Sequence, residues 1–188
     1  MRLSEPRISP VGDKDFTPEQ IEVLRGFEGR PVLNIFRTLA QAPKALSRFL
    51  EWGNYILSRR NSLAPREREI IILRIGYLCR SGYEFAQHRR IGLREGLTEA
   101  EIAAIKAGAG DASWSAADRA LIRACDELHA DQFITKATWA DLGRILDDKQ
   151  RMDLVFTAGQ YTQVSMILNT FGVQLEDPAD LDPDLDGR

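Results

Sequence analysis

Cysteine and histidine are scarce in this chain, and their spacing limits the chemistry they can support. The 188 residues include two cysteines, Cys79 and Cys125, and two histidines, His88 and His129. The cysteines lie far apart and form no C-x-x-C pair. This spacing argues against a disulfide scaffold, a zinc site and a self-contained dithiol redox motif. We therefore expect no metal site.

The chain also lacks an excess of charge and a long apolar run. Its 25 basic and 28 acidic residues give a net charge of −3, which predicts no general attraction to nucleic acid or an anionic membrane. The basic stretch HRRIGLR would fit a DNA-binding helix, but its surroundings are acidic. The longest apolar stretch, residues 70–78, is too short to span a bilayer, and the polar N-terminus is unlike a signal peptide. A cytoplasmic location is expected.

Helical spacing of apolar residues dominates the rest of the sequence. Pro18, Pro43 and Pro65 stand where a proline is tolerated best, at the first position of a helix, and Thr98 to Glu101 form a capping box. Sustained apolar–polar alternation is missing, so the predicted fold class is all-α. We expect an N-terminal arm over 1–17, one helical domain over 18–177, and an acidic, disordered or loosely docked tail over 178–188.

Two of the predicted helices are apolar on more than one face. Residues 70–78 nearly encircle their helix with apolar side chains, and residues 156–171 are similar. A helix that is apolar all round lies at the centre of a bundle or between subunits. In a chain this short, two such helices predict a homo-oligomer.

The densest group of reactive side chains surrounds His88. Glu84 precedes it by four residues, so both share a helix face, and Ser81 lies on that face too. A carboxylate beside an imidazole raises the pKa of the imidazole and fixes its tautomer, as proton transfer requires. From the pattern alone, an ordinary ion pair on a solvated face is the more common interpretation. His129 lies near a helix end, where a cation is favourable.

The stretch LAPREREIIILRIGYLCRSGYEFAQHRRIGLREGLTEAEIAAI resembles the signature region of the carboxymuconolactone decarboxylase family, whose fold is shared with AhpD-type alkylhydroperoxidases. The matching elements are R-E-R-E before an apolar helix, then Y-E-x-x-x-H, then G-L-T-x-x-E-I. The likeness extends over roughly residues 30–177 and implies an AhpD-like helical bundle. A trimer or hexamer is the expected assembly, and no metal or organic cofactor is implied.

The resemblance assigns family positions to individual residues. The glutamate of the AhpD pattern falls on Glu69 and its histidine on His88, whereas the two cysteine positions fall on Ser81 and Glu84. Both thiols of the peroxidase motif are therefore missing. Cys79 lies two residues before the first cysteine position. It is either a lone peroxidatic thiol that needs an external resolving thiol or a small core residue.

What remains is an acid–base group that suits the decarboxylase branch of the family. There the substrate is a small unsaturated lactone or related carboxylic acid. His88 is the expected acid/base, with Glu69 orienting it and Glu84 tuning the site. A thiol-dependent alkylhydroperoxidase and a non-catalytic helical oligomer stay open as alternatives.

Further residues are candidates for binding the substrate. Ser81 or Tyr83 would donate hydrogen bonds, and Arg74 would meet the substrate carboxylate or form a buried pair with a glutamate. Trp52 and Tyr161 would form an apolar pocket wall, or else belong to the core. The N-terminal arm and early helices are expected to shape the pocket entrance.

Overall fold

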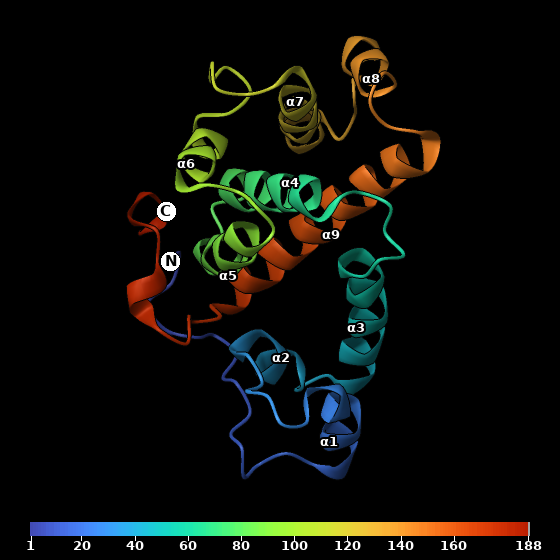
Figure 1. Ribbon diagram of the computed structural model, residues 1–188. Helices are drawn as coiled ribbons and strands as arrows, with labels where there is room; N and C mark the ends of the chain where they lie inside the picture. The colour runs from blue at the N-terminus through green and yellow to red at the C-terminus, as the bar shows by residue number, and fades with distance from the viewer. Residues whose placement is uncertain (188) are drawn as a thin grey trace.

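The computed structural model describes residues 1–187, and over that range it contains helices and loops but no strand (Figure 1). The predicted all-α class is thereby confirmed. The α-helices are α1 (Pro18–Leu24), α2 (Asn34–Leu39), α3 (Pro43–Leu57), α4 (Pro65–Leu78), α5 (Gly82–Arg94), α6 (Glu99–Ala107), α7 (Ala116–Asp131), α8 (Lys136–Leu142) and α9 (Asp148–Phe171). Short 3-10 helices are η1 (Arg25–Phe27), η2 (Pro178–Asp180) and η3 (Pro183–Leu185).

Local sequence signals fix where these helices begin. The Thr17 side chain accepts a hydrogen bond from the backbone N–H of Gln20, and Oε1 of Gln20 accepts one from the backbone N–H of Thr17. The same reciprocal box opens α6 at Thr98 and α9 at Asp147. The starts of α1, α3, α4 and α6 thus agree with the sequence prediction.

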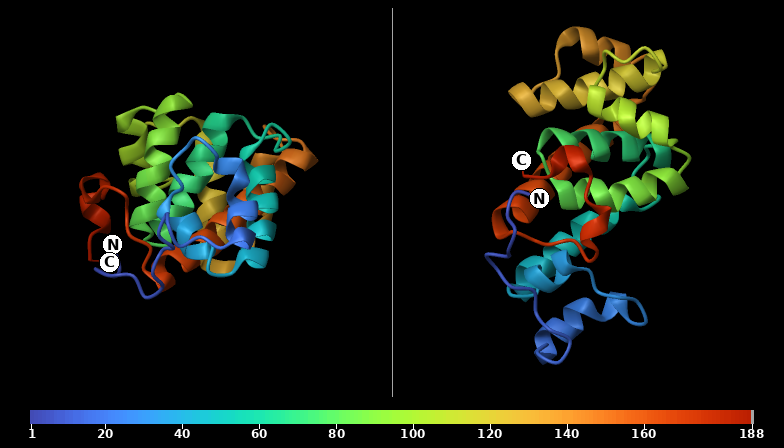
Figure 2. Two further views of the ribbon diagram at one scale, coloured as in Figure 1. Left: turned by 90° about the horizontal axis from the view of Figure 1, so that it is seen from below. Right: turned by 90° about the vertical axis from the view of Figure 1, so that its left-hand side faces the viewer.

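Helix α4 lies at the centre of the bundle, with α5, α6, α7 and α9 packed around it (Figures 1 and 2). The run from Ile70 to Ile75 is fully buried apart from a small part of Arg74. The apolar belt of this helix is therefore covered within a single chain and needs no partner subunit. Helix α9 differs, because Met152 and Met166 are more than half exposed. The oligomeric state stays a prediction, now resting on α9 rather than on α4.

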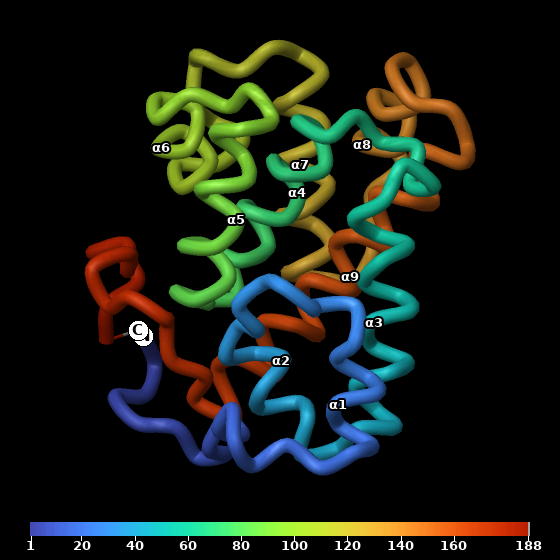
Figure 3. Tube along the Cα trace, turned by 60° about the horizontal axis from the view of Figure 1, so that its bottom comes forward, coloured from blue at the N-terminus to red at the C-terminus, as the bar shows by residue number. Residues whose placement is uncertain are grey.

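Helices α1, α2 and α3 gather at one end of the molecule (Figure 3), where α3 packs against α1, α2 and α9. They have a small apolar cluster of their own, centred on Val11, Leu24, Ala40 and Leu46. Between this cluster and the α4 core the chain encloses a cavity. No described helix is long and apolar enough to cross a membrane.

The C-terminal segment is docked on the bundle, contrary to the expectation of a disordered or loosely held tail. Leu185 is 1% exposed, and Lys106 holds Asp182 at 2.9 Å. The N-terminal amine of Met1 donates to the carbonyl of Leu185 at 3.0 Å, which brings the two chain ends together (Figure 2). An aliphatic side chain buried this well anchors the segment despite its acidic composition. Of the predicted tail, residue 188 lies outside the described residues.

Candidate active site

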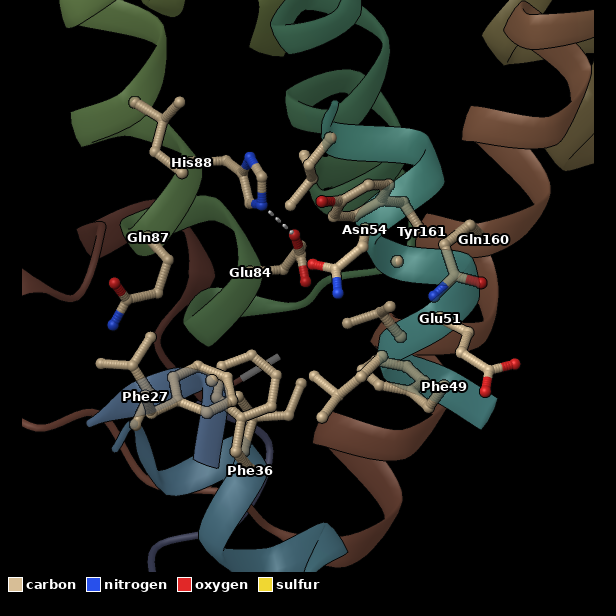
Figure 4. Close-up of a pocket in the computed structure, with 18 of the residues that line it drawn as sticks. Phe27, Phe36, Phe49, Glu51, Asn54, Glu84, Gln87, His88, Gln160 and Tyr161 are labelled. Carbon is tan, nitrogen blue, oxygen red and sulfur yellow. Dashed lines mark ion pairs between the residues drawn. The ribbon is translucent and has the colours of Figure 1, made fainter. Parts of the chain in front are cut away.

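A cavity of about 500 Å³ lies between α1, η1, α2 and α3 on one side and α5 and α9 on the other (Figure 4). This volume suits a small organic molecule. Most of the wall is apolar, including Phe27, Phe36, Phe49, Leu50, Ile35 and Val164. The early helices thus supply much of the wall, in line with their expected place at the pocket entrance.

His88 and Glu84 enter the wall of this cavity from α5 (Figure 4). The Nδ1 atom of His88 lies 2.7 Å from Oε2 of Glu69, which belongs to α4, and Nε2 lies 3.1 Å from Oε1 of Glu84. The first contact is a hydrogen bond, whereas the second has the distance of an ion pair without hydrogen-bond alignment. The edge of the ring also meets the ring of Tyr161, with centroids 4.8 Å apart. The structure thus brings together the three predicted acid–base residues.

Two glycines let α4 and α5 approach closely enough for this contact. A Cβ at Gly76 would lie 3.2 Å from the Glu84 side chain, and one at Gly92 would lie 2.9 Å from Leu97 and 3.7 Å from Glu69. The distances to Glu84 and Leu97 are shorter than comfortable carbon contacts, whereas the distance to Glu69 is an ordinary contact. The turn between the helices contains Arg80 in the left-handed region, with φ of 54°. The absence of two methyl groups therefore allows a carboxylate of α4 to reach the imidazole of α5.

The proton affinities of the group follow from its burial. Burial raises the pKa of Glu84 to about 7, and the nearby Glu69 adds to this rise while His88 opposes it. Burial by itself would lower the pKa of His88, but the charges of Glu69 and Glu84 together raise it above its ordinary value. Burial and the same two carboxylates raise the pKa of Tyr161 well above the usual range, so its phenol stays protonated. The group can hold and release protons near neutral pH.

The comparison with protein families matches residues 43–127 to the carboxymuconolactone decarboxylase family. The matched range contains Glu69, Glu84 and His88, so the acid–base group lies wholly inside the family region. The resemblance read from the sequence is thereby confirmed.

Solved structures show how far the fold is shared. An AhpD-core, peroxidase-related protein from Ralstonia eutropha superposes with a TM-score of 0.76 at 21% identity, covering 93% of this chain and 95% of that one. A variant of the debrominase Bmp8 bound to 2,3,4-tribromopyrrole superposes with a TM-score of 0.77 at 14% identity, covering 94% and 95%. A protein from Agrobacterium tumefaciens described as a putative antioxidant defence protein AhpD gives 0.69 at 18% identity, covering 74% and 95%. These likenesses confirm the AhpD-like fold, and the comparison with curated proteins finds no match.

Arg74 does not line the cavity. Its Nε donates to Asp126 at 2.6 Å, and its Nη1 donates to the carbonyl of Ile105 at 2.8 Å. The side chain leaves α4 on the face that packs against α6 and α7, away from His88. The prediction that Arg74 meets a substrate carboxylate is therefore wrong, and its buried partner is an aspartate rather than a glutamate.

Two other predicted binding residues also lie off the cavity wall. Ser81 is fully buried, and its Oγ has no hydrogen-bond partner among the described residues. Trp52 is 39% exposed and stacks on Tyr55 with centroids 5.2 Å apart. Neither is part of the cavity lining. Ser81 precedes the first turn of α5 as its N-cap residue, and Trp52 packs against Tyr55 and Phe156.

Tyr83 and Tyr161 do line the cavity, as predicted. The Tyr83 hydroxyl already donates to Oε1 of Glu176 at 2.8 Å, so Tyr83 contributes its ring rather than a free donor. Figure 4 shows the phenol of Tyr161 directed toward the side where His88 and Glu84 lie. Tyr161 is therefore the better placed of the two for contact with a bound molecule.

The cysteines stand apart from the family site. Cys79 ends α4, where its Sγ lies 3.7 Å from Nδ1 of His129. Burial raises the pKa of Cys79 and, more strongly, that of Cys125. Neither residue lines the cavity. Among the described residues, no group of three or more His, Cys, Asp or Glu side chains is placed to hold a metal ion.

The sequence reasoning missed Asn54 and Gln160, two amides in the cavity wall. It also missed the contribution of Phe27, Phe36 and Phe49. Aromatic residues at helical spacing look the same whether they fill a core or line a cavity. The one available signal was that Gln160 interrupts the apolar face of α9 next to Tyr161.

Proposed function

We propose that this protein is a cofactor-free lyase or isomerase that moves a proton at carbon on a small unsaturated lactone or aromatic-derived carboxylic acid. The observation that carries the proposal is His88, held between two buried carboxylates in the wall of an apolar cavity. Membership of residues 43–127 in the carboxymuconolactone decarboxylase family supports the reaction class.

In the proposed decarboxylation, His88 is the acid. Glu69 binds Nδ1 and leaves Nε2 toward Glu84 and the cavity. The bond between the ring and the substrate carboxylate breaks, CO₂ leaves, and the electron pair moves onto the lactone carbonyl as a dienolate. The proton on Nε2 then passes to carbon, and solvent returns a proton to His88. Glu69 stabilises the imidazolium form that the reaction needs.

Glu84 and Arg30 would receive the substrate carboxylate in place of Arg74. With a pKa of about 7, Glu84 is a neutral acid in a large share of molecules at neutral pH and can donate to an anionic oxygen. Arg30 supplies a positive charge among the lining residues. An anionic group at the cavity mouth would therefore have one cation and one neutral acid within the site.

A thiol-dependent alkylhydroperoxidase is the second candidate, because one similar structure is described as an AhpD antioxidant defence protein and another as peroxidase-related. The geometry supports it less, since Cys79 and Cys125 lie outside the cavity lining. A non-catalytic helical oligomer is the third reading. We also propose a homo-oligomer, a trimer or hexamer, on the basis of the exposed apolar side chains of α9, and light scattering in solution tests the oligomeric state. The cytoplasmic location stays a prediction from the sequence.

Two assays test the reaction. The first follows loss of 4-carboxymuconolactone by ultraviolet absorbance and CO₂ release, and the second follows thiol-coupled reduction of cumene hydroperoxide. We expect His88→Ala to lower the first activity by about 100-fold or more, as removal of a general acid does. The matched control is His129→Ala, which removes the other histidine outside the cavity.

The outcomes separate the three readings. Decarboxylation that survives His88→Ala would contradict the acid–base role. Peroxide reduction that Cys79→Ser abolishes would establish the thiol enzyme instead. If the wild-type protein shows no turnover in either assay, the non-catalytic helical oligomer is favoured.

A further inference from the structure

Gln160 carries an amide in the cavity wall that has no hydrogen-bond partner among the described residues. It belongs to α9, is 5% exposed and lines the cavity. Its side chain makes no hydrogen bond with any other group in residues 1–187. Neither polar atom of this amide is among the fully buried atoms that lack a partner, so both are reached from the cavity. A wall that keeps such a group is suited to a ligand that provides the missing partner.

Other amides of the cavity wall have different surroundings. Gln87 donates from Nε2 to Oε2 of Glu176 at 2.6 Å, so its amide is already occupied. Asn54 lies on α3 and is exposed, so water can satisfy it. Gln160 is thus the most buried of these three amide residues, and its amide has no hydrogen-bond partner among the described residues.

The position of Gln160 relates it directly to the acid–base group. Its neighbour Tyr161 contacts the edge of the His88 ring. Figure 4 shows the Gln160 amide on the α9 side of the cavity, across from His88 and Glu84 on α5. A planar ring molecule in this space would have one edge near His88 and the opposite edge near Gln160.

We propose that Gln160 is a substrate-binding residue that donates a hydrogen bond to the ring carbonyl oxygen of a lactone or cyclic ketone. The proposal rests on the proposed function, because it is this oxygen that receives electrons during decarboxylation. A neutral N–H donor suits both the uncharged carbonyl and the developing oxyanion. It does so without placing another full charge beside Glu69, Glu84 and His88.

The assignment also defines the class of substrate. The apolar aromatic wall selects a flat, mostly hydrocarbon ring, and Gln160 selects among such rings for those with a carbonyl oxygen on the edge away from His88. An analogue that replaces the carbonyl by a methylene group leaves the amide unpaired. Sites built to hydrogen-bond a polar group reject such analogues more strongly than sites that only fit a shape.

Binding of two matched probes tests the proposal without any turnover. Dihydrocoumarin and chroman have the same fused rings and differ in one position, a carbonyl against a methylene. Affinity is measured by calorimetry with wild type, Gln160→Leu and the control Gln163→Leu, an exposed glutamine of the same helix. We expect Gln160→Leu to weaken dihydrocoumarin by about 10-fold, typical of one lost hydrogen bond, and to leave chroman within about twofold. Gln163→Leu should change neither.

Two outcomes would overturn the assignment. Equal loss of both probes in Gln160→Leu would make the residue a shape determinant only. Failure of wild type to prefer dihydrocoumarin over chroman would contradict the proposal even if the variant does not fold. The wild-type protein separates this proposal from the reaction: a carbonyl preference without decarboxylase activity would refute the reaction but not the binding role. In the active enzyme, Gln160→Leu should raise KM and lower kcat. In the binding assay, a purely structural role of Gln160 would change the affinity for both probes alike.

Discussion

Glu84→Gln should stabilise the protein at alkaline pH and leave it nearly unchanged at acidic pH. The substitution keeps the size and hydrogen-bonding capacity of the side chain but removes its charge. Glu84 is 3% exposed and faces Glu69 as well as His88, so its ionised form is held in an unfavourable place. The amide stays neutral at every pH and avoids that penalty.

The sign and size follow from the two pKa values of the carboxyl. The folded value is about 7 and the ordinary value is 4.5, so the folded state holds the proton more tightly than the unfolded chain. The contribution of this proton to the free energy of unfolding is fully present below about pH 4.5 and is lost as the pH rises to about 7. The gap between the values corresponds to about 3 kcal/mol at most, since a tenfold change in proton affinity is worth about 1.4 kcal/mol.

Urea denaturation followed by circular dichroism at pH 5 and pH 8 measures this difference, at one salt and protein concentration. The free energy of unfolding of Glu84→Gln relative to wild type should rise by about 2 to 3 kcal/mol between the two pH values. Glu51→Gln is the matched control, because Glu51 also lines the cavity but has an exposed side chain paired with Arg48. A difference that does not vary with pH, or a variant less stable than wild type at pH 8, would refute the reasoning.

Other expectations concern the reaction, the thiols and the tail. The kcat/KM for a carboxylate substrate should fall above about pH 7 as Glu84 loses its proton, and a profile that stays flat to pH 9 would contradict its role as a donor. Native protein should react with a thiol-specific chromogenic disulfide slowly at Cys79 and not at Cys125, because the pKa of each thiol is raised, and two fast equivalents would disagree with the burial. Leu185→Ala should lower the free energy of unfolding by about 2 to 4 kcal/mol, measured by urea denaturation, and an unchanged midpoint would mean that the tail is not anchored.

The helices could be predicted because their ends depend on neighbouring residues. Pro18, Pro43 and Pro65 mark helix starts in the structure as in the sequence. The docked tail was not foreseen, because its acidic composition hides the single buried contact of Leu185. The centre of the bundle was partly foreseen, since residues 70–78 are apolar all round, but the sequence alone could not tell covering helices from a partner chain.

The site was predictable only where it is local or matches a family pattern. The pairing of Glu84 with His88 follows from helical spacing, whereas Glu69 was placed by resemblance, since nothing local predicts how α4 turns toward α5. Arg74 was misplaced because a charge in an apolar helix gives no sign of the face to which it points. Gln160 was missed because its role depends on a cavity formed by helices more than 100 positions earlier in the chain.

The glycines at 76 and 92 mean that the chemistry could be lost while every ionisable residue is retained. An alanine at Gly76 adds a methyl group about 3.2 Å from the Glu84 side chain, and Glu84 or the α5 helix that carries it would have to shift to admit it. A diverged relative could therefore keep Glu69, Glu84 and His88 in its sequence and still have no working acid. For chains of this kind, the small residues between the two helices are as informative about activity as the charged residues themselves.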